Sequence, residues 1–356
     1  MRGEPLLGDW RPEPKLRVAG REVPRAAVPA VDTHNHLGRW LKPDGGWAVP
    51  DPAALVAQMD ECNVAAVVNL DGRWGDELEA NLDRFDRAHP GRFATFCHVD
   101  WSPLSISDAT DDLVRSLERS ARAGAVGLKV WKDVGLEVRD HGSELVLPDD
   151  PRLGPVWDAA GALGLPVMIH TGDPAAFFDP VDERNERLLE LLAYPELRHR
   201  RPGAPTFERL IASLESTVAA HPRTRFIGAH VGCHAEDLGW VDRMLATYAN
   251  FFVDTAGRVA ELGRQPRAAR RLILDHADRV LWGSDAYPPT AAAWGTNFRF
   301  LETDDEHFAY SDDPIPPQGR WQVSALDLPA EVLRPVYRDN ALRLLPRLAE
   351  ATGGGP

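Results

Sequence analysis

The stretch VDTHNHLGRW, residues 31–40, starts as an apolar run and ends in two histidines, His34 and His36. Side chains two residues apart in a strand point to the same side, so both imidazoles face one way if this run is a strand. Imidazole nitrogen binds a metal such as zinc at about 2.0–2.1 Å, and carboxylate oxygen does so at a similar distance. A His-x-His pair alone is a weak motif, and it predicts a metal site only if other strands supply further ligands.

Apolar runs rich in β-branched residues alternate with helical patterns from residue 28 onward. The predicted strands are residues 28–34, 64–70, 92–99, 125–131, 165–171, 225–231, 250–256 and 279–285. The predicted helices are residues 51–62, 76–88, 108–123, 152–163, 206–220, 235–248, 258–276 and 329–349. Alternating strands and helices are typical of a parallel sheet with right-handed crossovers. Eight such units predict an α/β protein with a closed (β/α)8 TIM barrel.

The segments outside this pattern divide the chain. We expect one barrel domain over residues 28–349, an N-terminal arm over residues 1–27 and a disordered tail over residues 350–356. Two segments are longer than a barrel needs, namely residues 173–205 after the fifth strand and residues 287–328 after the eighth. Insertions after strands lie at the C-terminal face, where barrel enzymes build their sites, so both are predicted to be lids.

The composition excludes several classes of function. A net charge of −14 argues against unspecific binding to nucleic acid. The three cysteines, Cys62, Cys97 and Cys233, are far apart and are not expected to form a disulfide framework, which fits a reducing cytosol. The N-terminus has no apolar stretch of signal-peptide length, and no apolar run is long enough to span a bilayer. We therefore expect a cytoplasmic protein without a membrane partner.

Most of the predicted strands deliver a polar side chain at the C-terminal end. These side chains are His34 and His36 on the first strand, then His98, Lys129, His170, His230, Asp254 and Asp285 on the third to the eighth. Polar residues that end apolar strands at one face indicate a site rather than a core. Two histidines from one strand, one from another and a carboxylate opposite would hold a divalent metal and leave a position open for water, as catalytic sites do.

Six motifs between residues 28 and 347 resemble one known superfamily. They are VDTHNH (31–36), GLKVWK (127–132), PVMIHTGDP (166–174), FIGAHVG (226–232), VLWGSD (280–285) and VYRDNALRLL (336–345). This set resembles the amidohydrolase superfamily, in particular the branch that holds aminocarboxymuconate semialdehyde decarboxylase and related metal-dependent barrel hydrolases. The resemblance implies that the metal ligands are His34, His36, His170 and Asp285.

The resemblance also implies roles for the remaining strand-end residues. Asp285 would take a proton from metal-bound water, and His230 would either bind a second metal or polarise the water or the substrate. Lys129 matches a lysine that is carboxylated and bridges two metals in some members, and that binds substrate or pairs with a carboxylate in others. We expect one divalent metal, with zinc preferred and manganese, cobalt or iron also suited to these ligands, and two metals if Lys129 is carboxylated. A homodimer is a further expectation from the family.

The ligand set predicts a metal-dependent hydrolase that uses activated water to cleave an amide, ester or lactone bond of a small organic substrate. The alternative is non-oxidative decarboxylation of a small carboxylic acid at the same site. A second alternative is a barrel that binds without catalysis, and the intact ligand set argues against it.

Residues in the strand-end regions are candidate contacts for the substrate. They are Lys129, His98, His234, Arg258, Trp40 and Tyr287, with Asp173 as a further pocket wall. His98 could equally make a core hydrogen bond, and His234 could be an ordinary residue of a first helical turn. Arg258 and Arg264 either bind a substrate carboxylate or belong to a solvated helix face with Glu261.

Other polar and aromatic residues are assigned away from the site. Asp32 is predicted to be structural, and Trp131 is placed between the barrel and its helices. Surface or loop positions are predicted for His141, His199, His276 and His307.

Overall fold

The computed structural model describes residues 6, 9, 13, 15–106, 109–313 and 316–351 of the chain. Within these residues eight strands form, and each overlaps a predicted strand. The strands are β1 (Ala30–Asn35), β2 (Val64–Asn69), β3 (Phe93–Thr95), β4 (Leu128–Val130), β5 (Val167–Ile169), β6 (Phe226–Gly228), β7 (Phe251–Asp254) and β8 (Val280–Leu281). Most are shorter than predicted.

All strand pairs in the described chain are parallel, and neighbouring strands follow one another in sequence. The strands form a three-stranded sheet in the order β1-β2-β3 and a five-stranded sheet in the order β4-β5-β6-β7-β8. The register pairs Val67 with Phe93 in the first sheet and Val167 with Phe226 in the second. This topology confirms the predicted α/β class with parallel strands, since each return to a parallel neighbour needs a crossover.

The single closed ladder that the sequence predicts is not observed as such, because the strands divide into two sheets. Backbone hydrogen bonds nevertheless cross both seams. On one side Lys129 N donates to Cys97 O at 2.7 Å, and on the other Thr33 N donates to Trp282 O at 3.1 Å and Asp285 N to His34 O at 2.9 Å. Because β8 has only two residues, the hydrogen bonds between β8 and β1 are too few to form a continuous ladder.

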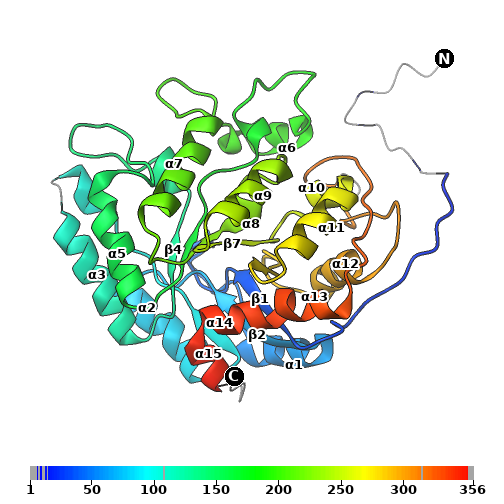
Figure 1. The fold of residues 1–356 in the computed structure, drawn as a ribbon, viewed down its shortest axis with the longest axis horizontal. Coiled ribbons are helices and arrows are strands. Elements are labelled where there is room, and N and C mark those ends of the chain that lie inside the picture. The colour runs from blue at the N-terminus through cyan, green and yellow to red at the C-terminus, as the bar shows by residue number, and fades with distance from the viewer. Residues whose placement is uncertain are drawn as a thin grey trace.

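The helices cover the outside of the strands (Figure 1). They are α1 (Pro52–Cys62), α2 (Gly75–Asn81), α3 (Thr110–Ala123), α4 (Asp133–Leu136), α5 (Gly154–Ala162), α6 (Leu188–Ala193), α7 (Phe207–Ala220), α8 (Ala229–Gly232), α9 (Leu238–Thr247), α10 (Val259–Arg264), α11 (Pro266–Asp275), α12 (Ala291–Glu302), α13 (Ala330–Arg334), α14 (Asn340–Leu344) and α15 (Pro346–Ala351). A π-helical segment, Leu82–Arg87, continues α2, and another, Pro335–Asp339, joins α13 to α14.

Proline and capping residues explain where these helices begin. The Asp51 side chain accepts hydrogen bonds from the Ala53 and Ala54 amides and caps α1 as the sequence predicts. The predicted helix over residues 258–276 is divided at Pro266, which has no amide hydrogen and opens α11. Pro346 opens α15 in the same way, so the predicted helix over residues 329–349 is several short segments and continues to Ala351.

Both sheets contribute to one buried apolar cluster. It contains one or more side chains from seven strands and from the C-terminal helices, including Val31, Val68, Ala94, Met168, Ile227, Phe252, Leu281, Leu344 and Leu348. Side chains that converge from both sheets in this way fill one common interior. The apolar interior lies below the strand ends that carry the predicted site residues, so it holds those ends in fixed positions.

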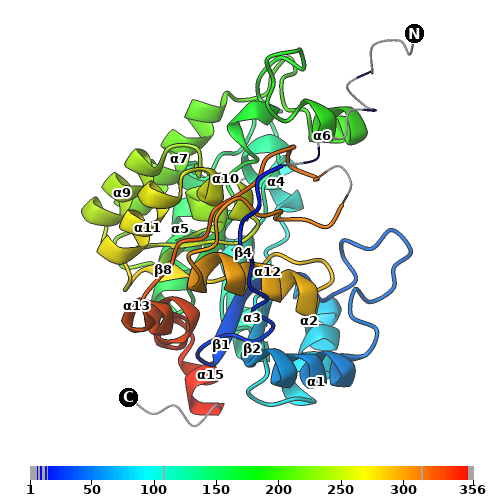
Figure 2. The same ribbon diagram turned by 90° about the vertical axis from the view of Figure 1, so that its right-hand side faces the viewer.

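The predicted arm and insertions are fixed to the rest of the molecule. Near the end of the arm, Ala26 N donates to Cys62 O at 3.0 Å and Arg21 N donates to Asp305 Oδ2 at 2.7 Å. The arm therefore runs beside α12 and the loop that follows it (Figure 2). The insertion after β5 carries α6, which lies at the end of the molecule opposite α15 (Figure 2). Residues 352–356 of the predicted tail lie outside the described residues.

In the described chain, no helix is long and apolar enough to cross a membrane.

Candidate metal centre

The predicted site residues lie where β1, β4, β5, β6, β7 and β8 end, and most of them are buried. His34 and His36 end β1, and their relative exposure is 0% and 4%. His170 and His230, after β5 and β6, are 6% and 3% exposed. Asp285, after β8, differs because its side chain keeps 30% of its exposure. The centre is thus a buried group of histidines with one carboxylate that faces outward.

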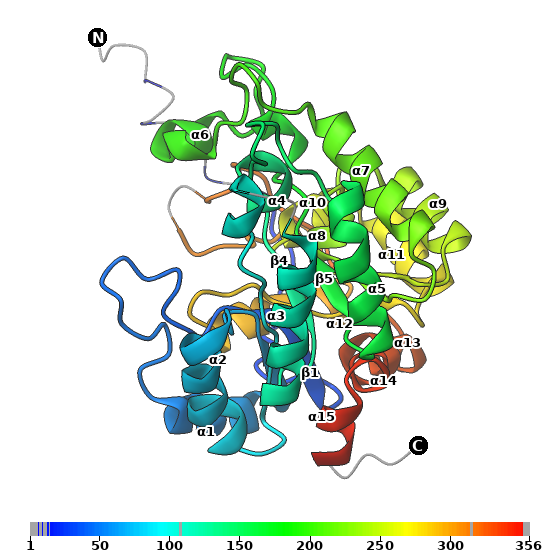
Figure 3. The same ribbon diagram turned by 90° about the vertical axis from the view of Figure 1, so that its left-hand side faces the viewer.

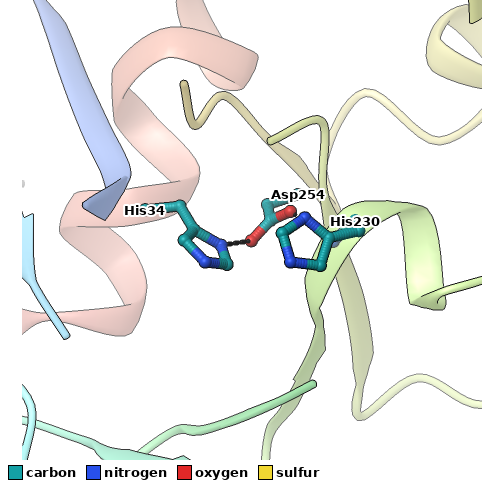
Figure 4. Close-up of side chains that lie close together, drawn as sticks. All are labelled: His34, His230 and Asp254. Carbon is teal, nitrogen blue, oxygen red and sulfur yellow. Dashed lines mark hydrogen bonds and ion pairs between the residues drawn. The ribbon is translucent and has the colours of Figure 1, made fainter. Parts of the chain in front are cut away.

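His34 is held by a buried carboxylate. Its Nδ1 lies 2.7 Å from Oδ2 of Asp254, which ends β7 and is itself fully buried (Figure 4). A carboxylate can only accept, so Nδ1 carries the hydrogen and Nε2 keeps its lone pair. That Nε2 lies 3.8 Å from Asp285 Oδ1 and 3.3 Å from Lys129 Nζ. Hydrogen bonding to Asp254 therefore fixes the tautomer in which Nε2 has a lone pair, which accepts from Lys129 here and is the donor that a metal would use.

His36 is held in the same way by Asp71, a residue that the sequence analysis did not single out. Its Nδ1 lies 2.6 Å from Asp71 Oδ1, and Asp71 Oδ2 accepts from the Gly38 amide at 3.1 Å. His36 Nε2 then lies 3.9 Å from Asp285 Oδ1. Asp71 follows Asn69, the last residue of β2, by two positions, so its place at a strand end was a signal available in the sequence.

His34, His36 and Asp285 form a donor set that suits a metal. Each offers one ligand atom, and these atoms lie within 4.8 Å of one another. Ligand atoms about 2.0–2.2 Å from one ion are separated by distances of this order. The set agrees with three of the four ligands implied by the family resemblance, and the donor types are those that divalent transition metals prefer.

A second group of similar spacing consists of His34, His230 and Asp254 (Figure 4). Here the polar atoms are already engaged with one another. Asp254 Oδ1 accepts from the His230 amide at 2.7 Å, and His230 Nδ1 donates to Ala256 O at 2.8 Å. His230 also has a backbone φ of 56°, in the left-handed region that non-glycine residues rarely adopt. We interpret Asp254 as a hydrogen-bonded support for His34, whereas the Nε2 of His230 keeps its lone pair because Nδ1 is the donor.

His170, the fourth predicted ligand, is buried, and among the described residues neither of its ring nitrogens has a hydrogen-bond partner. The nearest carboxylate oxygen, Asp173 Oδ1, is 3.7 Å from Nε2, which is too long for a hydrogen bond. Its ring lies beside that of His230, with centroids 4.5 Å apart. A buried imidazole without a partner costs free energy, and a bound ion would remove that cost.

Two of the candidate ligands, His34 and His170, are in the protonation state that a metal requires. Burial lowers the pKa of His34 well below its usual range, and the charge of Lys129 lowers it further. Burial also lowers the pKa of His170 to about 3. Neutral imidazole, not imidazolium, donates its lone pair to a metal. The residues present therefore fit a divalent ion.

Two buried cations lie next to these ligands. Lys129, on β4, is fully buried, and burial lowers the pKa of its amine to about 8 although Asp254 and Asp285 oppose that effect. Arg258, after β7, is 8% exposed and donates from Nη1 to Gly257 O at 2.9 Å. Within the described chain, neither cation has a carboxylate oxygen within 4.0 Å. Burial in turn raises the pKa of Asp285, which the charges of His36 and Lys129 reduce only in part.

Trp131 does not lie between the barrel and its helices, and that assignment was wrong. Its ring lies beside His36 and His170, with centroids 5.5 and 5.2 Å away. Trp40 stands next to it, with ring centroids 4.8 Å apart. Trp131 is two residues after Lys129, so strand alternation places both side chains on the inner side. The two tryptophans form an aromatic wall of the centre.

The other predicted substrate contacts are distributed around the centre. His98 is buried, and its Nε2 donates to Leu70 O at 2.7 Å, as the core hydrogen-bond interpretation required. His234 packs against Phe207 and Trp240, with ring centroids 5.0 and 5.3 Å away. Neither belongs to the two groups that could hold a metal.

A cavity of about 550 Å³ adjoins Asp285. Tyr287, which is 45% exposed, lines it together with residues of α12 and of the loop around Tyr310. Since Asp285 is the most exposed of the candidate ligands, a molecule in this cavity could reach it. Arg264 is not among the residues that line this cavity, and its Nη1 lies 2.9 Å from Glu186 Oε2. Glu261 is buried, so it does not form the solvated helix face that was the alternative.

Two of the histidines predicted at surface or loop positions lie in loops, as predicted, but are buried there. His199 is 7% exposed, and its Nε2 lies 2.6 Å from Asp173 Oδ2. His276 is also 7% exposed and lies 2.8 Å from Asp242 Oδ1. In both cases an acidic partner from a distant segment satisfies the ring, and no local sequence pattern reveals that partner.

Asp32 has the structural role that the sequence predicts. It accepts from the Ser284 amide at 2.8 Å and from Trp294 Nε1 at 2.7 Å, and so joins β1 to the segment after β8 and to α12. Strict alternation would place Asp32 and His34 on one side of β1. The pairing of β1 with β2 is irregular between Asp32 and Asn35, which lets the two side chains bond to different elements.

Comparisons with known proteins agree with this fold. A family model described as amidohydrolase matches residues 31–347. The chain belongs to this amidohydrolase family, as the six motifs suggested. No curated protein matches its sequence.

Solved structures of several related folds resemble the whole chain. A 2,6-dihydroxybenzoate decarboxylase from Rhizobium is 18% identical with a TM-score of 0.55, over 90% of this chain and 99% of that one. A dihydroxybenzoic acid decarboxylase from a Polaromonas species, bound to manganese and the inhibitor 2-nitroresorcinol, is 16% identical with a TM-score of 0.57, over 90% and 97%. An uncharacterised TIM-barrel protein from Bordetella bronchiseptica is 12% identical with a TM-score of 0.58, over 90% and 99%. At these identities the likeness shows the fold.

Proposed function

We propose that this protein is a metal-dependent enzyme that removes carbon dioxide from a small carboxylic acid without an oxidant. The observation that carries the proposal is the pair of buried cations, Lys129 and Arg258, beside the candidate ligands. Neither has a carboxylate partner within 4.0 Å in the described chain, and a buried charge without a partner is costly. A substrate carboxylate would supply that partner. The two decarboxylases of similar fold support this choice of reaction over hydrolysis.

The metal site in this proposal uses His34, His36, His170 and Asp285. We propose one ion, zinc or manganese, because Asp254, the carboxylate of the second group, already accepts hydrogen bonds from His34, His230 and Ala256. The strands of the two sheets would form one barrel around it, which the hydrogen bonds across both seams support. When bound, the ion would polarise a substrate oxygen and stabilise negative charge on the substrate.

The protein side chains would bind the substrate, exclude water and transfer the proton. Lys129 and Arg258 bind and orient the substrate carboxylate, and Trp131 and Trp40 exclude water from one side. The bond between the carboxyl carbon and its neighbour breaks, carbon dioxide leaves, and the electron pair stays on the neighbouring carbon. That carbon takes the proton of the Asp285 carboxyl group, and water returns a proton to Asp285.

Hydrolysis of an amide, ester or lactone is the second candidate, since the family model carries the amidohydrolase description. In that reaction Asp285 accepts a proton from water instead of supplying one to carbon. The cavity of about 550 Å³ beside the exposed face of Asp285 gives water access to it.

The two reactions are separated by their products in ¹⁸O-labelled water. Protein loaded with zinc or manganese is incubated with 2,6-dihydroxybenzoate and, separately, with a panel of aryl amides, esters and lactones. Release of carbon dioxide with formation of resorcinol supports decarboxylation. Label in a new carboxylate from the panel supports hydrolysis and overturns the proposal. The Asp285→Asn variant is the control, since it should be inactive in either reaction.

A further inference from the structure

A second cavity lies outside the candidate metal centre. It has a volume of about 330 Å³ and is lined by residues that follow β2, β3 and β4. One of these residues, Asp133, begins the short segment α4, which Figure 3 shows near the end of β4. The side chains that decide its chemistry are Arg73, Trp74, His98, Asp100, Asp133 and Glu137, and a second cation, Arg139, lines the rim and donates to Ser143 O at 2.8 Å. No candidate metal ligand lines this cavity.

Two tryptophan rings hold the guanidinium of Arg73 in position at this cavity. Its guanidinium lies over the ring of Trp40 at 4.5 Å and over that of Trp74 at 4.2 Å, measured to the ring centroids. Its backbone has a φ of 55°, in the left-handed region that costs free energy for a residue with a Cβ. Stacking on aromatic faces holds the plane of an arginine without using its hydrogen-bond donors.

Most of those donors remain available. The hydrogen bond that Arg73 makes runs from Nη1 to Nδ1 of His98, at 3.4 Å. His98 Nε2 donates to Leu70 O, so its Nδ1 can only accept. In the described part of the chain, Arg73 has no carboxylate oxygen within 4.0 Å. A guanidinium carries five N–H groups, so this one can bind a carboxylate through two of them.

Three carboxylates face the same cavity. Asp100 accepts from the Ser102 amide at 3.0 Å, and Asp133 accepts from the Val134 amide at 2.9 Å. Glu137 is exposed at the rim. Each of these bonds uses one oxygen, which leaves a second oxygen of both aspartates for another donor. The cavity thus offers an unpaired cation and several unpaired carboxylate oxygens, with the indoles of Trp74 and Trp101 as apolar walls.

This mixture of charges selects the ligand. A simple anion would be attracted by Arg73 but repelled by the three carboxylates. A simple cation would be attracted by the carboxylates but repelled by Arg73. A molecule with one charge of each sign satisfies both sides and rejects the two simpler classes.

We propose that this cavity binds a small zwitterion, a free α-amino acid, with its carboxylate on Arg73 and its ammonium group on Asp133 and Asp100. The site is a neighbour of the metal centre, because Trp40 contacts both Arg73 and Trp131, and Trp131 contacts His36 and His170. It is independent of the reaction proposed above, since it uses none of the metal ligands.

The test is calorimetric titration of the full-length protein with the proteinogenic α-amino acids one at a time. For the amino acid that binds most tightly, two matched ligands follow: its amide, which lacks the carboxylate, and its N-acetyl derivative, which lacks the ammonium group. We expect saturable binding of the amino acid and affinity at least about 10-fold lower for each blocked form.

Protein variants test which side chain binds the carboxylate of the amino acid and which binds its ammonium group. Arg73→Gln should weaken the amino acid at least about 10-fold while leaving the amide nearly unchanged, and Arg73→Lys should not restore full affinity because it lacks the planar fork. Asp133→Asn should weaken the amino acid but not the N-acetyl form. Arg122→Gln is the matched control, since Arg122 is an exposed cation of α3 outside the cavity, with Nη1 3.9 Å from Glu118 Oε2.

Several results would overturn the proposal. They are absence of saturable binding by any amino acid, equal affinity for a blocked form, and an Arg73→Gln variant that binds like the wild type. The blocked ligands keep the test valid with wild-type protein if an Arg73 variant does not fold. Because no turnover is measured, failure here leaves the proposed decarboxylation untouched.

Discussion

His34 and His170 end two different strands of the same centre, and their surroundings differ. His34 is bonded through Nδ1 to Asp254 at 2.7 Å. His170 has a buried carboxylate nearby as well, but Asp173 is already bonded to Lys132 Nζ at 2.7 Å and to His199 Nε2 at 2.6 Å. Asp173 is therefore occupied, and within the described part of the chain the ring nitrogens of His170 are left without a partner.

The difference separates a histidine that belongs to the fold from one that depends on a ligand. Hydrogen bonding to Asp254 stabilises His34 whether or not a metal is present, and it sets the tautomer in advance. His170 gains a polar partner only when an ion binds. The same substitution at the two positions should thus change folding in one case and metal binding in both.

The largest effect is expected for His34→Leu. The change removes a ligand and leaves Asp254 buried without its partner, which costs about 3 kcal/mol or more in the metal-free protein. Metal affinity should fall by more than about 100-fold, beyond the effect of losing an outer-shell partner. Differential scanning calorimetry of the metal-free protein and metal titration measure the two effects. A metal-free variant as stable as the wild type would remove the structural role of the His34–Asp254 bond.

His170→Leu should abolish metal binding to a similar degree but leave the metal-free protein nearly as stable as the wild type. Leucine has a similar volume, and no hydrogen bond is lost. The measurement is the same pair of experiments, with His34→Leu as the matched comparison. If His170→Leu binds metal like the wild type, His170 is not a ligand.

Asp71→Asn tests the support of His36 and should have a smaller effect. The amide keeps the shape of the carboxylate but holds the imidazole less strongly, so metal affinity should fall about 10–100-fold while the fold is kept. Competition with a metal chelator gives the affinity, and far-UV circular dichroism checks the fold. Unchanged affinity would mean that His36 is oriented by its packing against Trp131 instead.

The two buried aspartates should respond to pH with opposite sign. Burial raises the pKa of Asp254 to about 6 from an ordinary 3.8, so in the folded state it keeps its proton at a pH where the unfolded chain releases one. Its contribution to the free energy of unfolding therefore falls as the pH rises from 3.8 to about 6. Asp254→Asn lacks this change and should gain stability relative to the wild type across that window.

Asp173 should behave in the reverse sense. Burial alone would raise its pKa, but the hydrogen bonds from His199 and Lys132 outweigh burial and hold the pKa well below 3.8. The stability that Asp173 provides is then present above pH 3.8 and is lost as the pH falls through the lower pKa of the folded state. Asp173→Asn should destabilise the metal-free protein at pH 7 and much less in acid. Thermal unfolding across this pH range gives both curves, and parallel curves would contradict the account.

The two-residue alternation of side chains along a strand and the positions of the strand ends predicted which residues come together at the centre. Each predicted strand overlaps an observed one, and His34, His36 and Asp285 come together because parallel strands place their C-terminal ends at one face. The same rule applied to Lys129 would have placed Trp131 at the centre. The error came from treating an aromatic residue as packing by default.

Long-range partners could not be predicted in this way. Asp71 and Asp254 bond to histidines through contacts between separate strands, and His199 reaches Asp173 from the far end of an insertion. No local period encodes such pairs, because their spacing depends on loop length. The division into two sheets was also beyond the sequence pattern, since it depends on how few residues β8 contributes.

The central claim is that these residues hold one divalent metal, and metal content per chain by inductively coupled plasma mass spectrometry tests it most directly. The protein would be loaded with zinc or manganese, with Lys129→Ala as the parallel sample. We predict about one metal per chain in both. About two in the wild type with a loss in Lys129→Ala would show a bridging lysine, and no metal after loading would contradict the account of His34, His36, His170 and Asp285.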